Sequence, residues 1–132
     1  MMRSDQDLSI ALQFMDNHIA SLEELELLVA LVGAPLRWWD ATMLSRELGI
    51  PKNVARTVLE RFARANLLDI RVTEDVRYQF RPTTRDLHDG AAALAMAYRT
   101  KPTALVHHLA ALRRRSVRDF ADAFRFRRNG RG

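Results

Sequence analysis

The sequence of 132 residues contains no cysteine and only two lysines. Without cysteine there is neither a disulfide framework nor a thiolate metal site, which fits a reducing compartment. Among the four histidines, His107 and His108 are adjacent, and adjacent residues on a helix point about 100° apart, so this pair does not form a metal-binding face. We read all four, including His18 and His88, as structural or surface residues. The sequence therefore predicts no metal and no other cofactor.

Long hydrophobic runs are also missing. The longest candidate, near residues 25–36, is too short to cross a bilayer and directly follows three glutamates. The first residues lack the basic start and apolar segment of a secretory signal, so we expect a cytoplasmic protein. The chain has no glycine-rich phosphate loop, no metal-ligand spacing and no nucleophile elbow, and its carboxylates lie at helix starts or on polar faces. An enzyme is therefore not expected.

Charge is distributed unevenly along the chain. The formal net charge is −5 over residues 1–35, +4 over residues 36–101 and +6 over residues 102–132, which gives the overall charge of +5. A basic middle and a strongly basic tail are suited to polyanionic partners. The alternative is a solvated surface that is merely rich in arginine.

Residues 38–66 predict two short helices joined by a tight turn. Asp40 can cap the first helix through its carboxylate, and Leu44 and Leu48 belong to its apolar stripe. Gly49 can take the left-handed conformation that ends a helix, and Pro51 has the fixed φ suited to starting the next one. The pattern is typical of a helix-turn-helix unit, and a packed helical hairpin with a solvated outer face is the alternative.

The second helix of this unit divides into an apolar and a polar side. Asn66 is suited to the left-handed position after its end. The residues expected to face the core are Val54, Ala55, Val58, Leu59 and Phe62, and those expected to face outward are Lys52, Asn53, Arg56, Thr57 and Glu60.

Two helices are predicted before this unit. Residues 6–19 carry Leu8, Leu12, Met15 and Ile19 at helical spacing, so this segment could cover the core or cross to a second subunit. A capping box follows, in which Ser21 and Glu24 satisfy each other's ends of the first turn. The helix that it starts is apolar over most of its circumference and ends at Gly33 and Pro35, so we expect it to form the buried centre. One of Trp38 and Trp39 should pack at the start of the next helix, unless the pair forms a stacking platform for bases.

Residues 68–81 predict a β-hairpin. Leu68, Ile70 and Val72 alternate with Asp69 and Arg71, as in a half-buried strand. After a polar connection over residues 73–75, the alternation repeats. In this second strand the residues expected to point inward are Val76, Tyr78 and Phe80.

The order of these elements resembles the winged helix-turn-helix regulators of bacteria. Over roughly residues 21–82, the turn Leu48-Gly49-Ile50-Pro51 and the stretch from Val58 to Leu68 are similar to the turn, recognition helix and helix exit of MarR-type repressors. The resemblance implies that the second helix reads bases in double-stranded DNA and that the hairpin is the wing. The wing here is short and has Glu74 and Asp75 at its tip, which phosphates would repel. The residues expected to contact DNA are Lys52, Asn53, Arg56, Thr57, Arg46, Arg71 and Arg77.

Residues 84–112 predict two helical segments, or one kinked helix, with Pro102 at the interruption. Leu87, Ala91, Leu94 and Tyr98 recur at helical spacing in the first segment. In winged-helix regulators such helices often form the dimer, which here predicts a homodimer. The alternative is that they complete the core of one monomer. In the second segment, the expected inner face consists of Leu105, Val106, Leu109 and Leu112.

The tail over residues 113–132 is basic and amphipathic. If it is helical from Ser116, then Val117, Phe120 and Phe124 share one side and arginines lie away from it. Such a helix suits a protein partner, a membrane surface or a nucleic-acid backbone, or its phenylalanines dock on the domain itself or on the other protomer.

The sequence as a whole predicts a mainly α fold with a small β-hairpin, a winged helix-turn-helix with N- and C-terminal helical extensions. The predicted regions are an N-terminal helix (1–20), the winged domain (21–82), C-terminal helices for dimerisation (83–112) and the basic tail (113–132). The predicted function is a sequence-specific DNA-binding transcriptional regulator. The alternatives are an interaction module or adaptor that uses the tail, and a nonspecific nucleic-acid binder.

Overall fold

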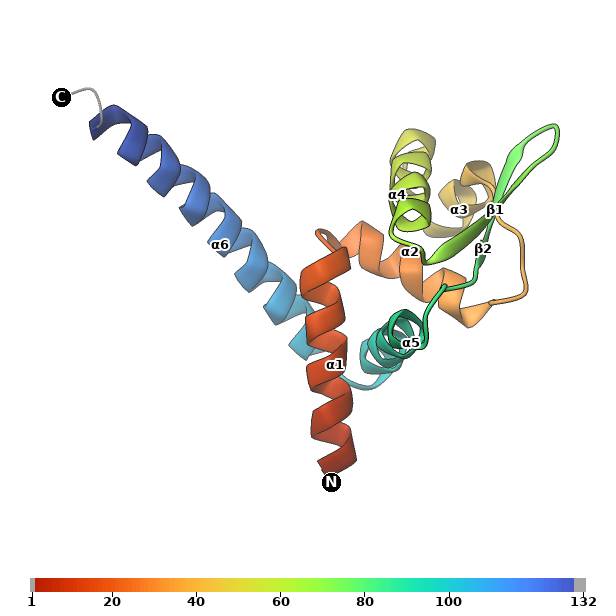
Figure 1. Ribbon diagram of the computed structural model, residues 1–132, viewed down its shortest axis with the longest axis horizontal. Helices are drawn as coiled ribbons and strands as arrows, with labels where there is room; N and C mark the ends of the chain where they lie inside the picture. The colour runs from red at the N-terminus through yellow and green to blue at the C-terminus, as the bar shows by residue number, and fades with distance from the viewer. Residues whose placement is uncertain (1, 130–132) are drawn as a thin grey trace.

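The computed structural model describes the backbone of residues 2–129 and the side chains of residues 6–115, 118 and 121. Six helices and one antiparallel hairpin make up this part of the chain, which confirms the predicted fold class. Figure 1 shows the hairpin at one end of the molecule and the last helix leading away from the other. The elements are α1 (Met2–His18), α2 (Leu22–Gly33), α3 (Ala41–Leu48), α4 (Lys52–Arg64), β1 (Leu68–Val72), β2 (Val76–Phe80), α5 (Arg85–Thr100) and α6 (Pro102–Asn129).

Helix α2 lies in the middle of the core, as its sequence predicts. The capping box at its start is confirmed: the Ser21 Oγ accepts a hydrogen bond from the Glu24 N–H at 3.2 Å and donates one to the Glu24 carboxylate at 3.1 Å. These bonds satisfy groups that the first turn of a helix leaves unpaired. The buried leucines of α2 are Leu25, Leu27, Leu28 and Leu31.

Helix α1 packs along α5 of the same chain. It begins at Met2 and ends at His18, where the sequence predicts residues 6–19. Phe14 lies outside the predicted stripe, yet it is buried against Gly90 of α5. A Cβ at position 90 would lie 2.5 Å from the Phe14 Cδ2, so only glycine allows this close approach. Thus α1 covers the core of its own chain.

Helices α5 and α6 are separate, with Lys101 between them. The Thr84 hydroxyl caps α5 by accepting from the Leu87 N–H at 3.2 Å. Leu105 and Leu109 of α6 are buried, so the first turns of α6 complete the core of this chain. The prediction that Val106 faces inward is wrong, since its side chain is exposed. The helix then continues without a break past residue 112 and leads away from the body in Figure 1.

The hairpin has the two predicted strands, and their pairing is antiparallel. Leu68 pairs with Phe80, Ile70 with Tyr78 and Val72 with Val76. A short bridge extends the pairing on the β2 side, where Trp39 and Tyr78 exchange two backbone hydrogen bonds of 2.7 Å. This bridge ties the segment before α3 to the hairpin.

Candidate nucleic-acid interface

The turn between α3 and α4 is built by local hydrogen bonds and one left-handed glycine. Asp40 caps α3, because its Oδ1 accepts from the Met43 N–H at 2.8 Å. Gly49 has a φ of 68°, a conformation that a residue with a Cβ adopts at a cost. The Ser45 hydroxyl donates to the carbonyl of the buried Ile50 at 2.6 Å. The predicted helix-turn-helix is therefore present, with α4 as its second helix.

Helix α4 presents its apolar side to the core and its polar side to solvent. Pro51 precedes its first residue and provides no side-chain hydrogen bond to the first turn. Asn66, which follows the end of the helix, has the predicted left-handed conformation with a φ of 67°. The buried residues of α4 are Ala55, Val58, Leu59 and Phe62.

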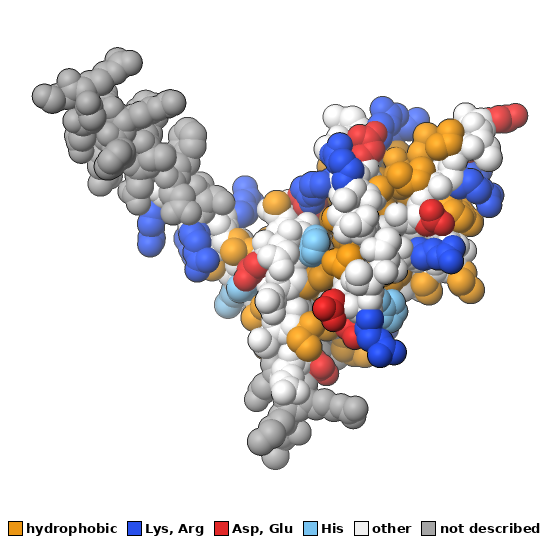
Figure 2. Space-filling view, in the orientation of Figure 1, with side chains coloured by type: hydrophobic (Ala, Val, Ile, Leu, Met, Phe, Trp, Pro, Cys, Tyr) orange, Lys and Arg blue, Asp and Glu red, His pale blue; other side chains and the backbone are white. Residues whose placement is uncertain are grey.

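The four predicted base-reading residues are all exposed on one side of α4. Lys52 and Asn53 lie in its first turn, and Arg56 and Thr57 follow one turn later. The Thr57 hydroxyl donates to the Asn53 carbonyl at 2.9 Å, so its oxygen remains free to accept. Arg46 is exposed near the end of α3. Figure 2 shows basic side chains around the free end of α4.

Tyr78 of β2 lies in the electrostatic field of the outer side of α4. Its side chain is buried, and burial raises the pKa of the Tyr78 phenol. The Glu60 carboxylate raises that pKa further, while the positive charge of Arg56 lowers it. Glu60 and Arg56 of α4 are therefore close enough to the Tyr78 phenol to influence its ionisation.

The wing holds both of its predicted DNA-contacting arginines in internal contacts. The guanidinium of Arg71 lies over the Trp38 ring, 4.8 Å from its centre. The Arg77 Nε donates to both carboxylate oxygens of Asp75, at 3.3 Å each. Figure 2 shows an acidic side chain at the far end of the hairpin. The positive charge of the wing is thus partly neutralised where phosphates would approach.

The apolar side of the wing is buried only at its base. Tyr78 and Phe80 are buried as predicted, but the prediction that Val76 points inward is wrong, because it is 42% exposed. Ile70 and Val72 are 49% and 72% exposed. Alternation identifies the shared face of the two strands, but the core ends below the tip of the hairpin.

The two tryptophans have different environments. Trp39 is 2% exposed and packs in the core, so it does not present a platform to bases. Arg37 covers its ring, with the guanidinium carbon 4.0 Å from the ring centre. Trp38 is half-buried, and the face of its ring is in contact with the guanidinium of Arg71. The expectation that one tryptophan packs at the start of α3 is confirmed.

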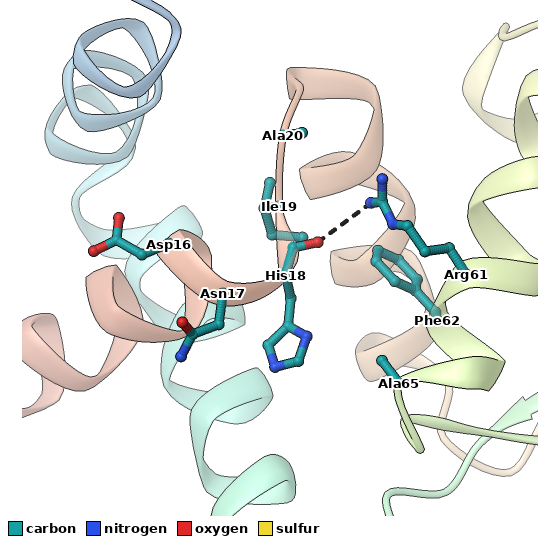
Figure 3. A pocket seen from close by; sticks show the side chains of 8 residues that line it. All are labelled: Asp16, Asn17, His18, Ile19, Ala20, Arg61, Phe62 and Ala65. Carbon is teal, nitrogen blue, oxygen red and sulfur yellow. Dashed lines mark hydrogen bonds between the residues drawn. The ribbon is translucent and has the colours of Figure 1, made fainter. Parts of the chain in front are cut away.

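A polar junction at the other end of α4 escaped the sequence analysis. Arg61 of α4 forms an ion pair with Glu24 and donates to the His18 carbonyl at 3.3 Å. Arg61 and His18 border an open cavity of about 270 Å³ between the end of α1 and α4 (Figure 3). Burial, followed by the nearby charge of Arg61, lowers the pKa of His18. The capping box was visible in the sequence, but its ionic partner was not.

The predicted partner-binding residues of the tail, Val117, Phe120 and Phe124, lie outside the described side chains. Arg113, Arg114, Arg115 and Arg118 are exposed on α6. Within the described residues, no group of three potential metal ligands comes together. The helices described here also include none that is long and apolar enough to span a bilayer.

Comparisons with family models and with curated proteins find no match. Among solved structures, the chain is similar to MepR of Staphylococcus aureus, a transcription regulator of the multidrug efflux pump MepA. The two are 13% identical, the match covers 93% of each chain and the TM-score is 0.50. A MepR mutant from a clinical isolate is 12% identical to this chain. The match covers 93% of this chain and 92% of the mutant, with a TM-score of 0.51. The chain is also similar to BpsR of Bordetella bronchiseptica, whose DNA binding is regulated by 6-hydroxynicotinic acid. The identity is 14%, the match covers 92% of this chain and 89% of BpsR, and the TM-score is 0.50.

At these identities the likeness concerns the fold. The chain has the winged helix-turn-helix fold of bacterial transcription regulators, and the resemblance predicted from residues 21–82 is confirmed at that level.

Proposed function

We propose that the protein is a sequence-specific DNA-binding transcriptional regulator that reads the major groove with α4 and acts as a homodimer. The observation that carries this proposal is the exposed set Lys52, Asn53, Arg56 and Thr57 on the first turns of α4. Arginine matches the acceptor pair of guanine, asparagine matches the donor and acceptor of adenine, and lysine suits phosphate or guanine. The neighbouring fold of MepR, described as a transcription regulator, supports the same role.

A binding test on two residues addresses the proposal directly. Duplexes selected by the wild-type chain from a random pool supply the preferred sequence. We expect Arg56→Ala to lose about 1–3 kcal/mol of binding free energy at one base position, the value of a good bidentate contact. Arg99→Ala, an exposed arginine on α5, is the control with the same change of charge. Unchanged footprints for both Arg56→Ala and Asn53→Ala would contradict the proposal.

The homodimer is supported by two-fold pairing in such regulators, which sets two reading helices about one DNA turn apart. Sedimentation equilibrium measures it. A mass of twice the 15.2 kDa chain is expected, and a monomer at micromolar concentration would contradict it.

A second candidate is an interaction module that uses the C-terminal helix. It is supported by the length of α6 beyond the core and by its exposed arginines at positions 113–115. A chain shortened after residue 112 separates the two candidates. Loss of protein partners with intact DNA binding would favour the module, whereas retention of every partner would count against it.

A further inference from the structure

The guanidinium of Arg61 joins three segments of the chain. It belongs to α4, forms an ion pair with Glu24 at the start of α2, and donates from Nη2 to the carbonyl of His18 at the end of α1. Figure 3 shows Arg61 pointing from α4 toward this carbonyl across the edge of the cavity. We call Glu24, Arg61 and the His18 carbonyl the clasp.

Glu24 is a fixed anchor for this contact. Its side chain is largely buried, and the residue is the only buried charged one among those described. The Oε1 accepts from the Ala20 N–H at 3.2 Å and the Oε2 accepts from the Ser21 hydroxyl at 3.1 Å. A buried carboxylate requires such partners, and they leave it little freedom to move. Arg61 therefore meets a counter-ion whose position the capping box determines.

The clasp is directional, whereas the other contacts of α4 with the core are not. Ala55, Leu59 and Phe62 bury apolar surface, which fixes the side of α4 that faces the core but involves no directional bond. An ion pair with a second hydrogen bond constrains both the rotation of the helix about its axis and its position along that axis. Arg61 lies five residues after Arg56, a distance of about 7.5 Å along the axis.

We propose that Glu24 and Arg61 are positioning residues for DNA reading, because the clasp sets the rotation of α4 and thereby the direction of Arg56 and Asn53. This inference rests on the proposed function of α4. A displacement of about 1 Å at base-contacting side chains breaks bidentate hydrogen bonds, whereas attraction to phosphates tolerates it. The clasp should therefore affect discrimination between sequences more than affinity for DNA in general.

The test compares Arg61→Gln and Glu24→Gln with Arg64→Gln. Arg64 is an exposed arginine one turn further along α4, and its substitution makes the same change of charge as Arg61→Gln. Fluorescence anisotropy measures affinity for a duplex selected by the wild-type chain and for a scrambled duplex of equal composition. Both clasp variants should lower the ratio of the two affinities about fivefold to tenfold, and the double variant should lose no more than either single one, because the two residues share one contact. Arg64→Gln should weaken both affinities equally.

Stability is separated from positioning by Arg61→Lys, which keeps the charge and loses the planar pair of donors. Arg61→Lys serves as the test if Arg61→Gln does not fold. Its ratio of affinities for the selected and the scrambled duplex should lie between the ratios of the wild type and Glu24→Gln. A folded Arg61→Gln or Arg61→Lys with the wild-type ratio would overturn the proposal, whatever its melting temperature.

A measurement without DNA distinguishes this inference from the proposed function. The amide ¹⁵N–¹H shifts of residues 52–57 should move in Arg61→Gln and stay in place in Arg64→Gln. If the wild type binds both duplexes equally, the proposed function fails, and the shifts alone decide whether the clasp sets the position of α4. Unmoved shifts in Arg61→Gln would overturn it.

Discussion

Helix α4 and the wing are the two parts that would contact DNA in the proposed function, and they differ in how their cations are held. Lys52 and Arg56 of α4 are exposed. In the wing, Arg71 lies over Trp38, and Arg77 is paired with Asp75. The comparison teaches that electrostatic attraction should be concentrated on one helix, while the wing presents apolar side chains and an acidic tip.

The two parts also differ in the apolar surface that supports them. Leu59 of α4 is fully buried, whereas Val72 of β1 is 72% exposed. Leu59→Ala should therefore lower the free energy of unfolding by about 2–5 kcal/mol, since it removes buried methyl groups and leaves a cavity. Val72→Ala should change it by less than about 0.5 kcal/mol. Urea unfolding followed by circular dichroism measures both.

Equal losses of unfolding free energy in Leu59→Ala and Val72→Ala would contradict the contrast between a buried α4 and an exposed wing tip. They would mean that the tip of the wing is covered in solution. Concentration dependence of the Val72→Ala effect would then identify a second copy of the chain as the cover.

The acidic tip of the wing can be neutralised without changing its shape. Glu74→Gln combined with Asp75→Asn removes two negative charges and the carboxylate that holds Arg77. We expect affinity for any duplex to rise a few-fold at low salt, and the slope of log K against log salt to steepen by about 0.9 for each new phosphate contact. Titrations at several salt concentrations measure both quantities.

The matched control is Glu23→Gln with Glu26→Gln, which makes the same change of net charge on α2, away from the hairpin. A rise in affinity as large in this control would assign the effect to overall charge. The wing would then gain no phosphate contact, and the contrast between α4 and the wing would not depend on Asp75.

Local sequence signals predicted the parts of the fold that local physics determines. The capping box at Ser21, the left-handed Gly49 and Asn66, and the two strands all follow from spacings of a few residues. The division of α4 into a buried and an exposed side follows from helical periodicity. The sequence therefore sufficed to predict the fold class, the second helix of the helix-turn-helix and the hairpin.

Contacts between distant segments were not predictable in the same way. The clasp joins Glu24 to Arg61, and the sequence around either residue gives no sign that the two form an ion pair. The close packing of Phe14 on Gly90 depends on two helices that adjoin only in the folded chain. Val76 was misplaced for a related reason, because alternation shows which side chains share a face and not how far the core extends beneath them.

The C-terminal end of α4 has one further feature, a histidine at the edge of the cavity beside it. His18 packs against Phe14 with ring centres 4.5 Å apart. It lines one cavity together with Asp16 and Arg61, and a second cavity together with Asp86 and Asp89. Burial first, and the charge of Arg61 second, lower its pKa below 6.5 in the folded chain. Folding therefore favours the neutral form of His18 over the protonated form.

The sign of the pH effect follows from this lowered pKa. Between the folded-state pKa and 6.5, the unfolded chain binds more protons than the folded one, so stability rises with pH in that window. The contribution is complete above 6.5, decreases as the pH falls, and decreases no further below the folded-state pKa. Urea midpoints measured between about pH 5 and pH 7 should therefore show a shallower pH dependence in His18→Gln than in the wild type. The exposed His107→Gln is the control for a histidine-to-glutamine change elsewhere in the chain. An unchanged slope in His18→Gln would contradict this prediction, because it would mean that protonation of His18 does not disturb the C-terminal end of α4.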